Sequence, residues 1–489
     1  MKLSNLLKEI EYEVLQGDIN CEITDLVYDS RKITEKSVFV CLVGANVDGH
    51  SFVNQAVENG ASAVIVEKAV SGMPENMAVI KVKNTRRALA LMSAAYFGYP
   101  ANQLTTIGLT GTKGKTTTTF MVKSVLESAG YKTGLIGTTG ILIGQESLPA
   151  KNTTPESYEI HKLFRQMVDS GCKYVVMEVS SQGLKYDRVA GINFDIGVFT
   201  NFSPDHIGPN EHTDMDDYAA SKSILFKNSK TAVANLDDES FETILKGHTC
   251  EVKTYGIENN ADLKAQNIEF IKENGRLGMK FVTSGAVNKE FTVYTPGMFS
   301  IYNSLVTIFV CNLLGIGNDD IAEGLLKVKV RGRVELVPCS PDFSVIIDYA
   351  HNEVSTKSVM NTLAEYKPNR MICVYGGGGN RSKLRRYDMG EVTGAMADLC
   401  ILSCDNPRDE EIADINNDIK IGLARSNGKY IEIEDRKEAI KYAIQNAQKG
   451  DFIVLLGKGH ETYQEIKGVK YHFDEREAVA EIRKELGFN

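Results

Sequence analysis

The chain has 489 residues, with 55 Lys and Arg against 64 Asp and Glu, and a net charge of −9. This acidic balance argues against a general nucleic-acid binder, which would carry a basic excess. No apolar run approaches the roughly 20 residues of a membrane span, and charges begin too early at the amino terminus for a signal peptide. At about 150 residues per domain, the length predicts roughly three globular domains.

Nine cysteines occur without any Cys-x-x-Cys pair, and most lie in apolar runs such as 371–375. In such a run a thiol acts as a small apolar side chain. This usage argues against a zinc site or a disulfide framework, and it predicts a reducing, cytoplasmic location.

The first hundred residues are expected to mix short strands and helices. Residues 37–44 and 61–66 have the apolar character of buried strands, and 53–58 are predicted to form a helix between them. The Gly/Pro break at 97–102 predicts a domain boundary near residue 100.

From residue 101 the pattern becomes α/β. A strand is expected at 104–109 and a helix at 115–129, which Gly130 is well placed to end. The strands expected at 174–179 and 196–202 are almost continuously apolar, as a sheet covered on both faces requires.

A third segment, from residue 331, predicts a second doubly wound sheet. Its expected strands are 343–347, 371–375, 399–402 and 452–456. Each is followed by a polar or glycine-rich loop, at 348–352, 376–381, 405–408 and 457–461. These could be four ordinary surface loops. Because ligands of open α/β sheets bind beyond the carboxyl ends of the strands, the coincidence favours one composite site.

The loop at 110–117, TGTKGKTT, joins the first strand of the central segment to its helix. Backbone amides in such a loop cradle phosphate oxygens, Lys115 adds positive charge, and Thr116 can offer its hydroxyl to Mg²⁺. The strict GxxxxGK[ST] pattern fails because Leu109 stands at its first position. The strand-loop-helix context nevertheless favours a nucleotide site over a glycine turn with an exposed lysine.

Three side chains downstream are candidates for metal chemistry. Glu178 lies in an otherwise apolar strand, where a carboxylate is rare unless it is paired or bound to metal. His206 follows the next strand, and a phosphate loop nearby favours a magnesium site over a structural role for either residue. On local pattern alone, Lys222 is interpreted as a solvated helix lysine.

Six motifs in this order make the chain resemble the Mur ligase family, the ATP-dependent amide-forming enzymes of peptidoglycan precursor synthesis. They are YDSR at 28–31, NTTPE at 152–156, EVSSQGL at 178–184, DYAH at 348–351, DNPR at 405–408 and GKGHE at 457–461. The resemblance covers essentially the whole chain and is closest to members that add the third stem-peptide residue. It implies an α/β, three-domain fold: a UDP-sugar-binding domain (1–100), a central P-loop ATPase (101–330) and a C-terminal Rossmann-like amino-acid-binding domain (331–489).

The resemblance also implies roles for individual residues. The ATP site would comprise Gly111, Thr112, Lys113, Gly114, Lys115, Thr116, Thr117, Asn303, Arg333 and Asp348. The catalytic residues would be Lys115, Glu178, His206 and Lys222, and Mg²⁺ would be held by Thr116, Glu178, His206 and Lys222, the last as a carbamate (N6-carboxylysine). The UDP-sugar peptide would contact Ser30, Asn152, Thr153, Thr154, Ser180 and Arg188. Diaminopimelate would contact Arg381, Asp405, Asn406, Pro407, Arg408, Gly457 and Glu461.

The implied reaction begins when the carboxylate of UDP-N-acetylmuramoyl-L-alanyl-D-glutamate attacks the γ-phosphate of ATP. The amine of meso-diaminopimelate then displaces phosphate from the acyl phosphate. Arg408 can grip the distal carboxylate of diaminopimelate, which lysine lacks. The resemblance further implies a monomer that binds only small molecules and serves cell wall biogenesis, cell shape and cell division.

Three alternatives remain at this point. The chain could be the lysine-adding counterpart of the same reaction. A folylpolyglutamate synthetase shares the ATPase core but should lack the DNPR and amino-terminal DSR segments. A catalytically silent nucleotide-binding protein is disfavoured by the presence of Lys115, Glu178, His206 and Lys222.

Overall fold

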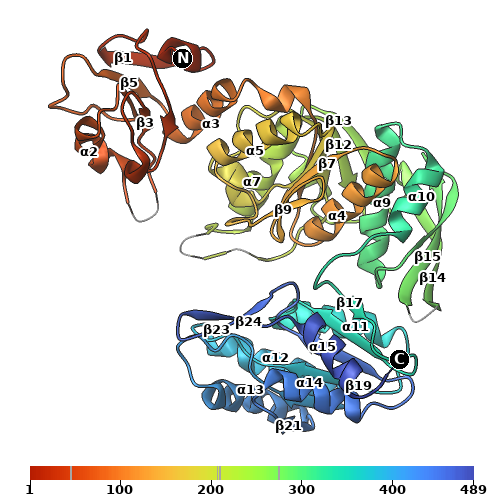
Figure 1. The fold of residues 1–489 in the computed structure, drawn as a ribbon. Coiled ribbons are helices and arrows are strands. Elements are labelled where there is room, and N and C mark those ends of the chain that lie inside the picture. The colour runs from red at the N-terminus through yellow and green to blue at the C-terminus, as the bar shows by residue number, and fades with distance from the viewer. Residues whose placement is uncertain (45–46, 206, 209–210, 274–275, 489) are drawn as a thin grey trace. The chain divides into compact units, whose positions relative to one another are not determined.

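The computed structural model describes residues 1–44, 47–205, 207–208, 211–273 and 276–488, and the chain forms two compact units (Figure 1). The first unit contains 1–264, 285–287 and 305–324, and the second contains 265–284, 288–304 and 325–489. Within the described ranges, no helix has the length and apolarity needed to span a membrane.

A five-stranded sheet, ordered β1-β5-β4-β3-β2, forms the amino-terminal part of the first unit. Its strands are β1 (Tyr12–Gln16), β2 (Leu26–Val27), β3 (Val38–Val40), β4 (Ala63–Val66) and β5 (Ala78–Val82). Only the β1–β5 pair is antiparallel. The helical segments are α1 (Leu3–Leu6), α2 (Val53–Glu58), α3 (Thr85–Tyr96) and the 3₁₀ turns η1 (Ser30–Lys32), η2 (Gly49–Phe52) and η3 (Pro100–Gln103).

Alternate side chains of β4 explain why this strand is apolar throughout. Ala63 and Ile65 enter the core shared with α1 and α3, whereas Val64 and Val66 enter the core shared with α2. A strand buried on both faces cannot alternate polar and apolar residues.

The central sheet of the first unit has the order β13-β12-β11-β6-β10-β7-β8-β9. Its strands are β6 (Thr105–Thr110), β7 (Thr133–Gly137), β8 (Gly140–Ile143), β9 (Glu146–Leu148), β10 (Tyr174–Glu178), β11 (Phe194–Phe199), β12 (Ser229–Asn235) and β13 (Glu251–Gly256). The strands from β13 to β7 are parallel, and β8 and β9 add an antiparallel edge. The helices are α4 (Lys115–Ser128), α5 (Ser157–Asp169), α6 (Ser181–Lys185), α7 (Met215–Lys227) and α8 (Phe241–Ile244).

The hydrogen-bonded order extends to eleven strands through β14 (Leu263–Glu273), β15 (Arg276–Gly285) and β16 (Lys289–Val293). Helices α9 (Met298–Leu313) and α10 (Asn318–Leu326) follow. In the second unit, Tyr366 donates its hydroxyl hydrogen to the Gly278 carbonyl at 2.8 Å, so β15 packs beside the C-terminal sheet.

The C-terminal sheet has the order β17-β18-β22-β19-β20-β21. Its strands are β17 (Glu335–Val337), β18 (Ser344–Asp348), β19 (Met371–Tyr375), β20 (Leu399–Leu402), β21 (Tyr430–Glu432) and β22 (Phe452–Leu456), all parallel except β17. A separate hairpin joins β23 (Tyr463–Ile466) to β24 (Val469–His472).

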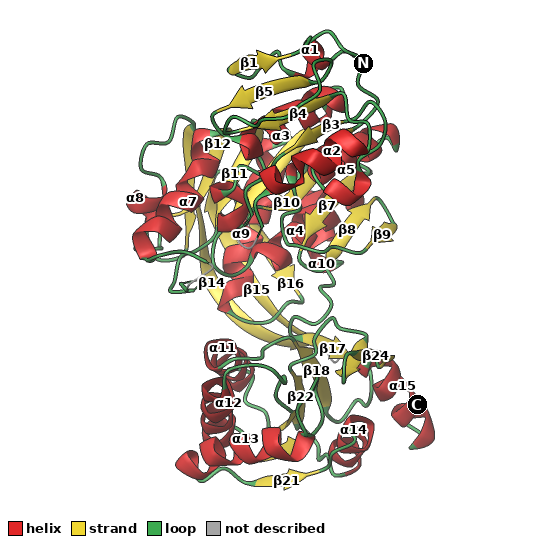
Figure 2. Cartoon of the chain, turned by 90° about the vertical axis from the view of Figure 1, so that its left-hand side faces the viewer, coloured by secondary structure: helices red, strands yellow, loops and turns green. Residues whose placement is uncertain are grey.

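Helices cover both faces of this sheet (Figure 2). One core contains side chains of α11 (Glu353–Ala364), α12 (Lys383–Met396) and α13 (Ile412–Ser426). The opposite core contains side chains of α14 (Arg436–Gln445) and α15 (Glu475–Glu485). The predicted doubly wound sheet is confirmed.

Most predicted elements are confirmed, and the strands at 371–375, 399–402 and 452–456 have the predicted bounds. The strand predicted at 196–202 instead ends at Phe199. Its last predicted residues turn away because Thr200 and Asn201 form hydrogen bonds with the phosphate loop. The interior strands β7, β12 and β13 were not predicted, nor were β8, β9 and β14–β16, which extend the sheet on either side.

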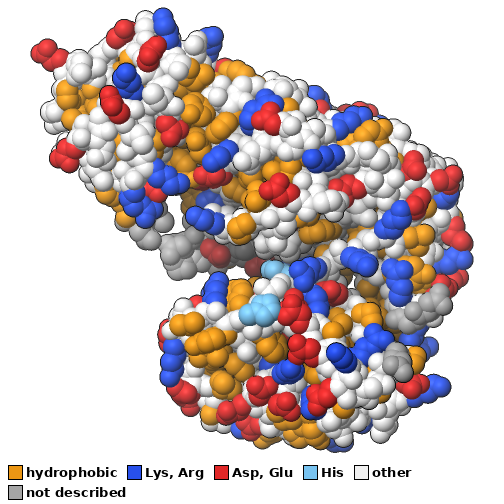
Figure 3. All heavy atoms as spheres, viewed as in Figure 1, with side chains coloured by type: hydrophobic (Ala, Val, Ile, Leu, Met, Phe, Trp, Pro, Cys, Tyr) orange, Lys and Arg blue, Asp and Glu red, His pale blue; other side chains and the backbone are white. Residues whose placement is uncertain are grey.

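All nine cysteines are free thiols, and seven are buried, which agrees with the absence of a disulfide framework. Acidic and basic side chains are interspersed over the face of the molecule shown in Figure 3. On this face, charges of both signs alternate rather than gathering by sign (Figure 3).

Candidate functional site

The predicted phosphate loop lies between β6 and α4 and is held against the segment that follows β11. The Thr112 and Lys113 amides donate to the carbonyl and side-chain oxygens of Asn201, both at 2.8 Å. Thr200 Oγ1 donates back to the Lys113 carbonyl at 2.8 Å. A Cβ at Gly111 would lie 1.9 Å from Thr200 Oγ1, so only glycine permits this approach.

Lys115, the first residue of α4, folds its side chain back over the loop. Its Nζ donates to the carbonyls of Gly111 and Thr112, at 2.7 and 3.1 Å. Gly114, which precedes the helix, has a φ of +85°, a left-handed conformation that favours glycine. A cation and a helix amino terminus therefore face the same loop, as phosphate binding requires.

Glu178 ends β10 with its side chain buried beside the phosphate loop. It accepts from Thr116 Oγ1 at 2.9 Å, and from the amide and hydroxyl of Thr138 at 3.0 and 3.1 Å. A Cβ at Gly137 would lie 2.4 Å from Glu178 Oε1, so the carboxylate occupies space that this glycine leaves open. Thr116 and Glu178, both predicted as metal ligands, are thus hydrogen-bonded to each other.

Lys222 is buried, so its interpretation as a solvated helix lysine is wrong. It lies on α7, its Nζ donates to the Gly111 carbonyl at 2.9 Å, and the ammonium lies 4.4 Å from the Tyr218 ring centre. Burial, with a smaller contribution from Lys115, lowers the pKa of Lys222 well below its ordinary value. His206, the fourth predicted catalytic residue, lies outside the described residues.

Four of the six residues expected to contact the UDP-sugar peptide form one connected group near the end of β10. Thr154 Oγ1 donates to the Glu178 carbonyl and accepts from the Ser180 amide, at 3.0 and 2.9 Å. Arg188 donates to the Thr154 carbonyl and forms an ion pair with Glu156 at 2.6 Å. Thr153 lies close to this group, because its hydroxyl is 2.9 Å from that of Thr138.

The sequence also predicts Asn152 and Ser30 as contacts of the UDP-sugar peptide. Asn152 is exposed in the loop before Thr153. Ser30 begins η1 of the amino-terminal sheet domain and is half-buried. Two residues earlier, the Tyr28 ring lies 6.0 Å from that of Tyr158 on α5.

The four C-terminal loops line a single pocket at the carboxyl ends of β18, β22, β19 and β20. Its walls include Tyr349, His351, Gly377, Gly378, Arg381, Asp405, Asn406, Arg408, Gly457 and Glu461. All four strands are parallel neighbours, so their ends meet at one edge of the sheet. Pro407, also predicted here, holds the turn between Asn406 and Arg408 but is not one of those wall residues.

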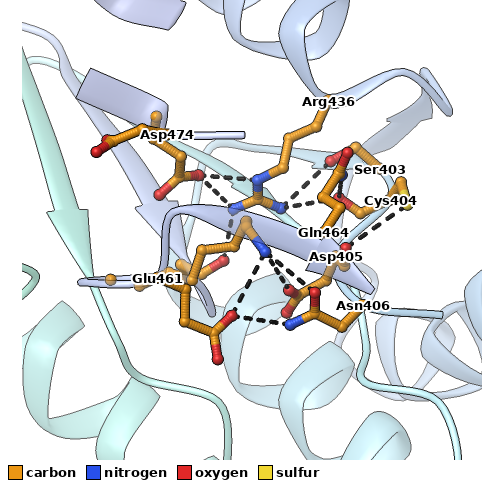
Figure 4. A network of polar contacts seen from close by, with 12 residues as sticks. Ser403, Cys404, Asp405, Asn406, Arg436, Glu461, Gln464 and Asp474 are labelled. Atoms are coloured by element: carbon orange, nitrogen blue, oxygen red, sulfur yellow. Dashed lines mark hydrogen bonds and ion pairs between the residues drawn. The ribbon is translucent and has the colours of Figure 1, made fainter. Parts of the chain in front are cut away.

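Side chains of both charges are fixed within this pocket. Arg408 donates from Nη1 to the Gly379 carbonyl at 2.6 Å and from Nε to Glu465 at 3.2 Å. Asn406 Nδ2 donates to Glu461 Oε2 at 2.8 Å. Asp405, Asn406 and Glu461 face one another in Figure 4. The pocket wall thus combines the partly exposed guanidinium of Arg408 with the carboxylates of Asp405 and Glu461, which suits a zwitterionic ligand.

Asn303, Arg333 and Asp348, expected at the nucleotide, belong to the second unit. Asp348 accepts from the amides of Val334 and Ala350, both at 2.7 Å, and burial raises its pKa. The Arg333 guanidinium lies 5.4 Å from the Tyr349 ring centre. Asn303 is buried on α9.

Several buried polar residues near these sites were not predicted from the sequence. Lys458 lies wholly buried beneath the C-terminal pocket, and Arg436 forms a buried ion pair with Glu475 at 2.7 Å (Figure 4 shows Arg436). His212 lies 2.8 Å from Ser181 Oγ and 3.1 Å from Asp217 Oδ2. Only Lys458 had a local signal, since it stands inside the GKGHE motif.

The donor set beside the phosphate loop fits Mg²⁺. In the described part of the chain, no three His, Cys, Asp or Glu residues come together as a metal-binding group. Mg²⁺, however, commonly takes one or two protein oxygens and completes its shell with water and phosphate. The Thr116 hydroxyl and the Glu178 carboxylate are such oxygens, and they lie 2.9 Å apart.

Comparison with known families gives three matches that together span most of the chain. Residues 22–97 match the model described as "Mur ligase family, catalytic domain". Residues 109–311 match "Mur ligase middle domain", and residues 332–459 match "Mur ligase, glutamate ligase domain".

Two curated relatives are similar to this chain over nearly its full length. UDP-N-acetylmuramoyl-L-alanyl-D-glutamate--2,6-diaminopimelate ligase of Clostridium perfringens is 44% identical over 489 residues, covering 99% of both chains. The protein of the same name from Caldanaerobacter subterraneus is 44% identical over 487 residues, also covering 99% of both.

A solved structure of UDP-N-acetylmuramoyl-L-alanyl-D-glutamate--2,6-diaminopimelate ligase superimposes with a TM-score of 0.74 at 27% identity, and both chains are covered completely. Folylpolyglutamate synthase of Mycobacterium tuberculosis gives a TM-score of 0.60 at 18% identity, covering 76% of this chain and 92% of that one. The second likeness concerns the fold alone.

Proposed function

We propose, since the chain belongs to the Mur ligase family, that it joins meso-diaminopimelate to UDP-N-acetylmuramoyl-L-alanyl-D-glutamate and converts ATP to ADP and phosphate. One observation carries the choice of amino acid: Arg408 lies beside Asn406 and Glu461 in a pocket formed by four loops. The relatives named diaminopimelate ligases, at 44% identity over full length, support the same choice.

The pocket is suited to the distal end of diaminopimelate, which carries both a carboxylate and an ammonium group. Arg408 donates from Nε to Glu465 and uses one Nη1 hydrogen for the Gly379 carbonyl. We assign the edge formed by the second Nη1 hydrogen and Nη2 to a carboxylate of the substrate, which it can bind in bidentate fashion. Glu461 and Asp405 provide acceptors for the ammonium group. Arg381 lies in the pocket wall and adds positive charge for a second carboxylate.

In the first step, the phosphate loop holds ATP while the D-glutamyl carboxylate approaches the γ-phosphate. Both reacting groups are anionic, so Lys115 and the amides at the start of α4 must lower their repulsion. Bound Mg²⁺ would supply further charge neutralisation at the phosphates. Thr116 and Glu178 would hold this ion, together with His206 and the carbamate of Lys222.

In the second step the amine attacks the acyl phosphate, so the substrate peptide that carries the acyl phosphate must be held in a fixed position. We assign Thr153, Thr154, Ser180 and Arg188 to that peptide, together with Asn152 and Ser30. By domain, we assign the UDP-sugar to residues 1–100, the ATP phosphates to 101–330 and the amino acid to 331–489. We also assign Asn303, Arg333 and Asp348 to contacts with ATP.

A product assay tests the proposal. Purified protein is supplied with Mg-ATP, the UDP-dipeptide and either meso-diaminopimelate or L-lysine, and the tripeptide and ADP are quantified. We expect diaminopimelate-dependent product and ADP in equal amounts. Preferential incorporation of lysine would overturn the amino-acid assignment, and no product with either amino acid would overturn the ligase assignment.

A further inference from the structure

We propose that Lys458 is a positioning residue that sets the preference of this pocket for diaminopimelate over lysine. The inference rests on the proposed function, because it concerns how the amino-acid pocket chooses between two substrates. It starts from an uncommon observation: a lysine with a fully buried side chain that lies behind the substrate-facing wall of the pocket.

Lys458 follows β22 and directs its ammonium group at three pocket residues. Its Nζ lies 3.2 Å from Asn406 Oδ1, 3.4 Å from Glu461 Oε2 and 3.6 Å from Asp405 Oδ1. A buried ammonium is costly unless its hydrogens and its charge are compensated. The three acceptors supply this compensation, and all three also line the pocket.

Lys458 and the Glu465 amide together fix which way the Asn406 amide points. Asn406 Oδ1 accepts from Lys458 Nζ and from the Glu465 amide, the latter at 2.9 Å. A flipped amide would place its NH₂ group against both donors, so the flip is excluded. Asn406 Nδ2 is consequently directed to Glu461, and its second hydrogen is available for a substrate carboxylate.

Lys458 also balances the charge behind the pocket. Asp405 and Glu461 bring two carboxylates to the wall, and the buried ammonium lies between them and offsets one. Without Lys458, the wall would carry more negative charge. It would then repel the distal carboxylate of diaminopimelate and attract the terminal ammonium of lysine, since charges interact strongly in a site of low dielectric.

The test measures kcat and KM with meso-diaminopimelate and with L-lysine for wild type and three variants of the full chain. Lys458→Met removes the charge and keeps the length, whereas Lys458→Arg keeps the charge. Lys437→Met is the matched control, because Lys437 is an exposed α14 lysine that forms an ion pair with Glu481. KM for ATP and the melting temperature are measured for each protein.

We expect Lys458→Met to lower kcat/KM for diaminopimelate by about tenfold or more, as for one lost hydrogen bond to a charged group. The value for L-lysine should not fall, so the preference ratio drops, while KM for ATP changes by less than about twofold. Lys458→Arg should retain more of the preference than Lys458→Met, and Lys437→Met should match wild type.

A Lys458→Met protein that keeps the wild-type preference ratio would overturn the inference, as would an equal loss with both amino acids. If Lys458→Met does not fold, Lys458→Gln removes the same charge with a polar side chain, and the same ratio decides. A wild-type protein without preference for diaminopimelate would overturn the proposed function itself, so the two failures are distinguishable.

Discussion

Replacing Arg408 with lysine tests whether the enzyme needs the two parallel hydrogen bonds that a guanidinium can donate to a carboxylate, without changing the net charge. The backbone here is fixed independently: Arg408 has a φ of +50°, its amide donates to the Glu465 carbonyl at 3.0 Å, and its carbonyl accepts from Lys467 at 2.7 Å. Lysine can occupy the same backbone conformation at similar cost. The change therefore acts mainly on the head group that would face the substrate.

An ammonium can donate to one carboxylate oxygen of diaminopimelate but cannot reproduce two parallel hydrogen bonds. The loss of one hydrogen bond to a charged group costs about 1.5–3 kcal/mol, which corresponds to about 10- to 150-fold in kcat/KM. L-Lysine has no distal carboxylate, so its kcat/KM should change by less than about threefold.

The assay measures steady-state ADP release with each amino acid at saturating ATP and UDP-dipeptide. Thermal melting of the variant, with and without ATP, shows whether the contacts of Arg408 with Gly379 and Glu465 also support the fold. Equal losses with both amino acids would refute the reasoning, because Arg408 would then act on the fold of the pocket rather than on the distal carboxylate.

Three further predictions concern other parts of the molecule. Thr116→Val removes the hydroxyl that bonds to Glu178, so we expect a higher Mg²⁺ requirement in a metal titration of ADP release; an unchanged requirement would contradict the assigned ligand. Burial lowers the pKa of His161 to about 4, and within the described structure its ring nitrogens have no hydrogen-bond partner. Stability should therefore be unaffected by His161 above pH 6.5 and fall by about 2 kcal/mol by pH 5, as the unfolded chain takes up the proton first; His161→Leu should lack this loss in denaturant titrations. Arg436→Met leaves the buried Glu475 without its cation, which should cost about 3–5 kcal/mol of unfolding free energy; a loss below about 1 kcal/mol would show that water or a shift in protonation replaces the ion pair.

The sheets were predictable because their strands are buried on both faces. The run Phe452–Leu456 is wholly apolar, and the structure covers it with helices on each side. Partly exposed strands such as β14 were not predicted, since they carry no continuous apolar signal. The buried strands β7 and β12 were also not predicted, because their Gly, Ala, Ser and Thr residues give only a weak apolar signal. The pocket followed from topology: loops after parallel neighbouring strands must meet at one edge.

Glu178 was predicted as a buried carboxylate, but the burial of Arg436, Glu475 and Lys222 could not be predicted, because their partners are distant in sequence. Arg436 and Glu475 are 39 residues apart, and each alone has the pattern of an exposed residue near a helix start. Lys222 was misinterpreted for the same reason: its enclosure depends on Gly111, a residue 111 positions earlier in the chain. Local periodicity reports the face of a helix, not what the rest of the fold places against it.

Lys115 is hydrogen-bonded to the loop in which it is proposed to bind phosphate. Its Nζ donates to the carbonyls of Gly111 and Thr112, so phosphate oxygens compete with these two neutral acceptors for the ammonium hydrogens. The net gain is the difference between these two sets of bonds, and so it is smaller than the gross attraction of lysine for phosphate. Lys115 therefore contributes less to nucleotide affinity than its charge alone would suggest, because part of the attraction replaces bonds that the loop itself can provide.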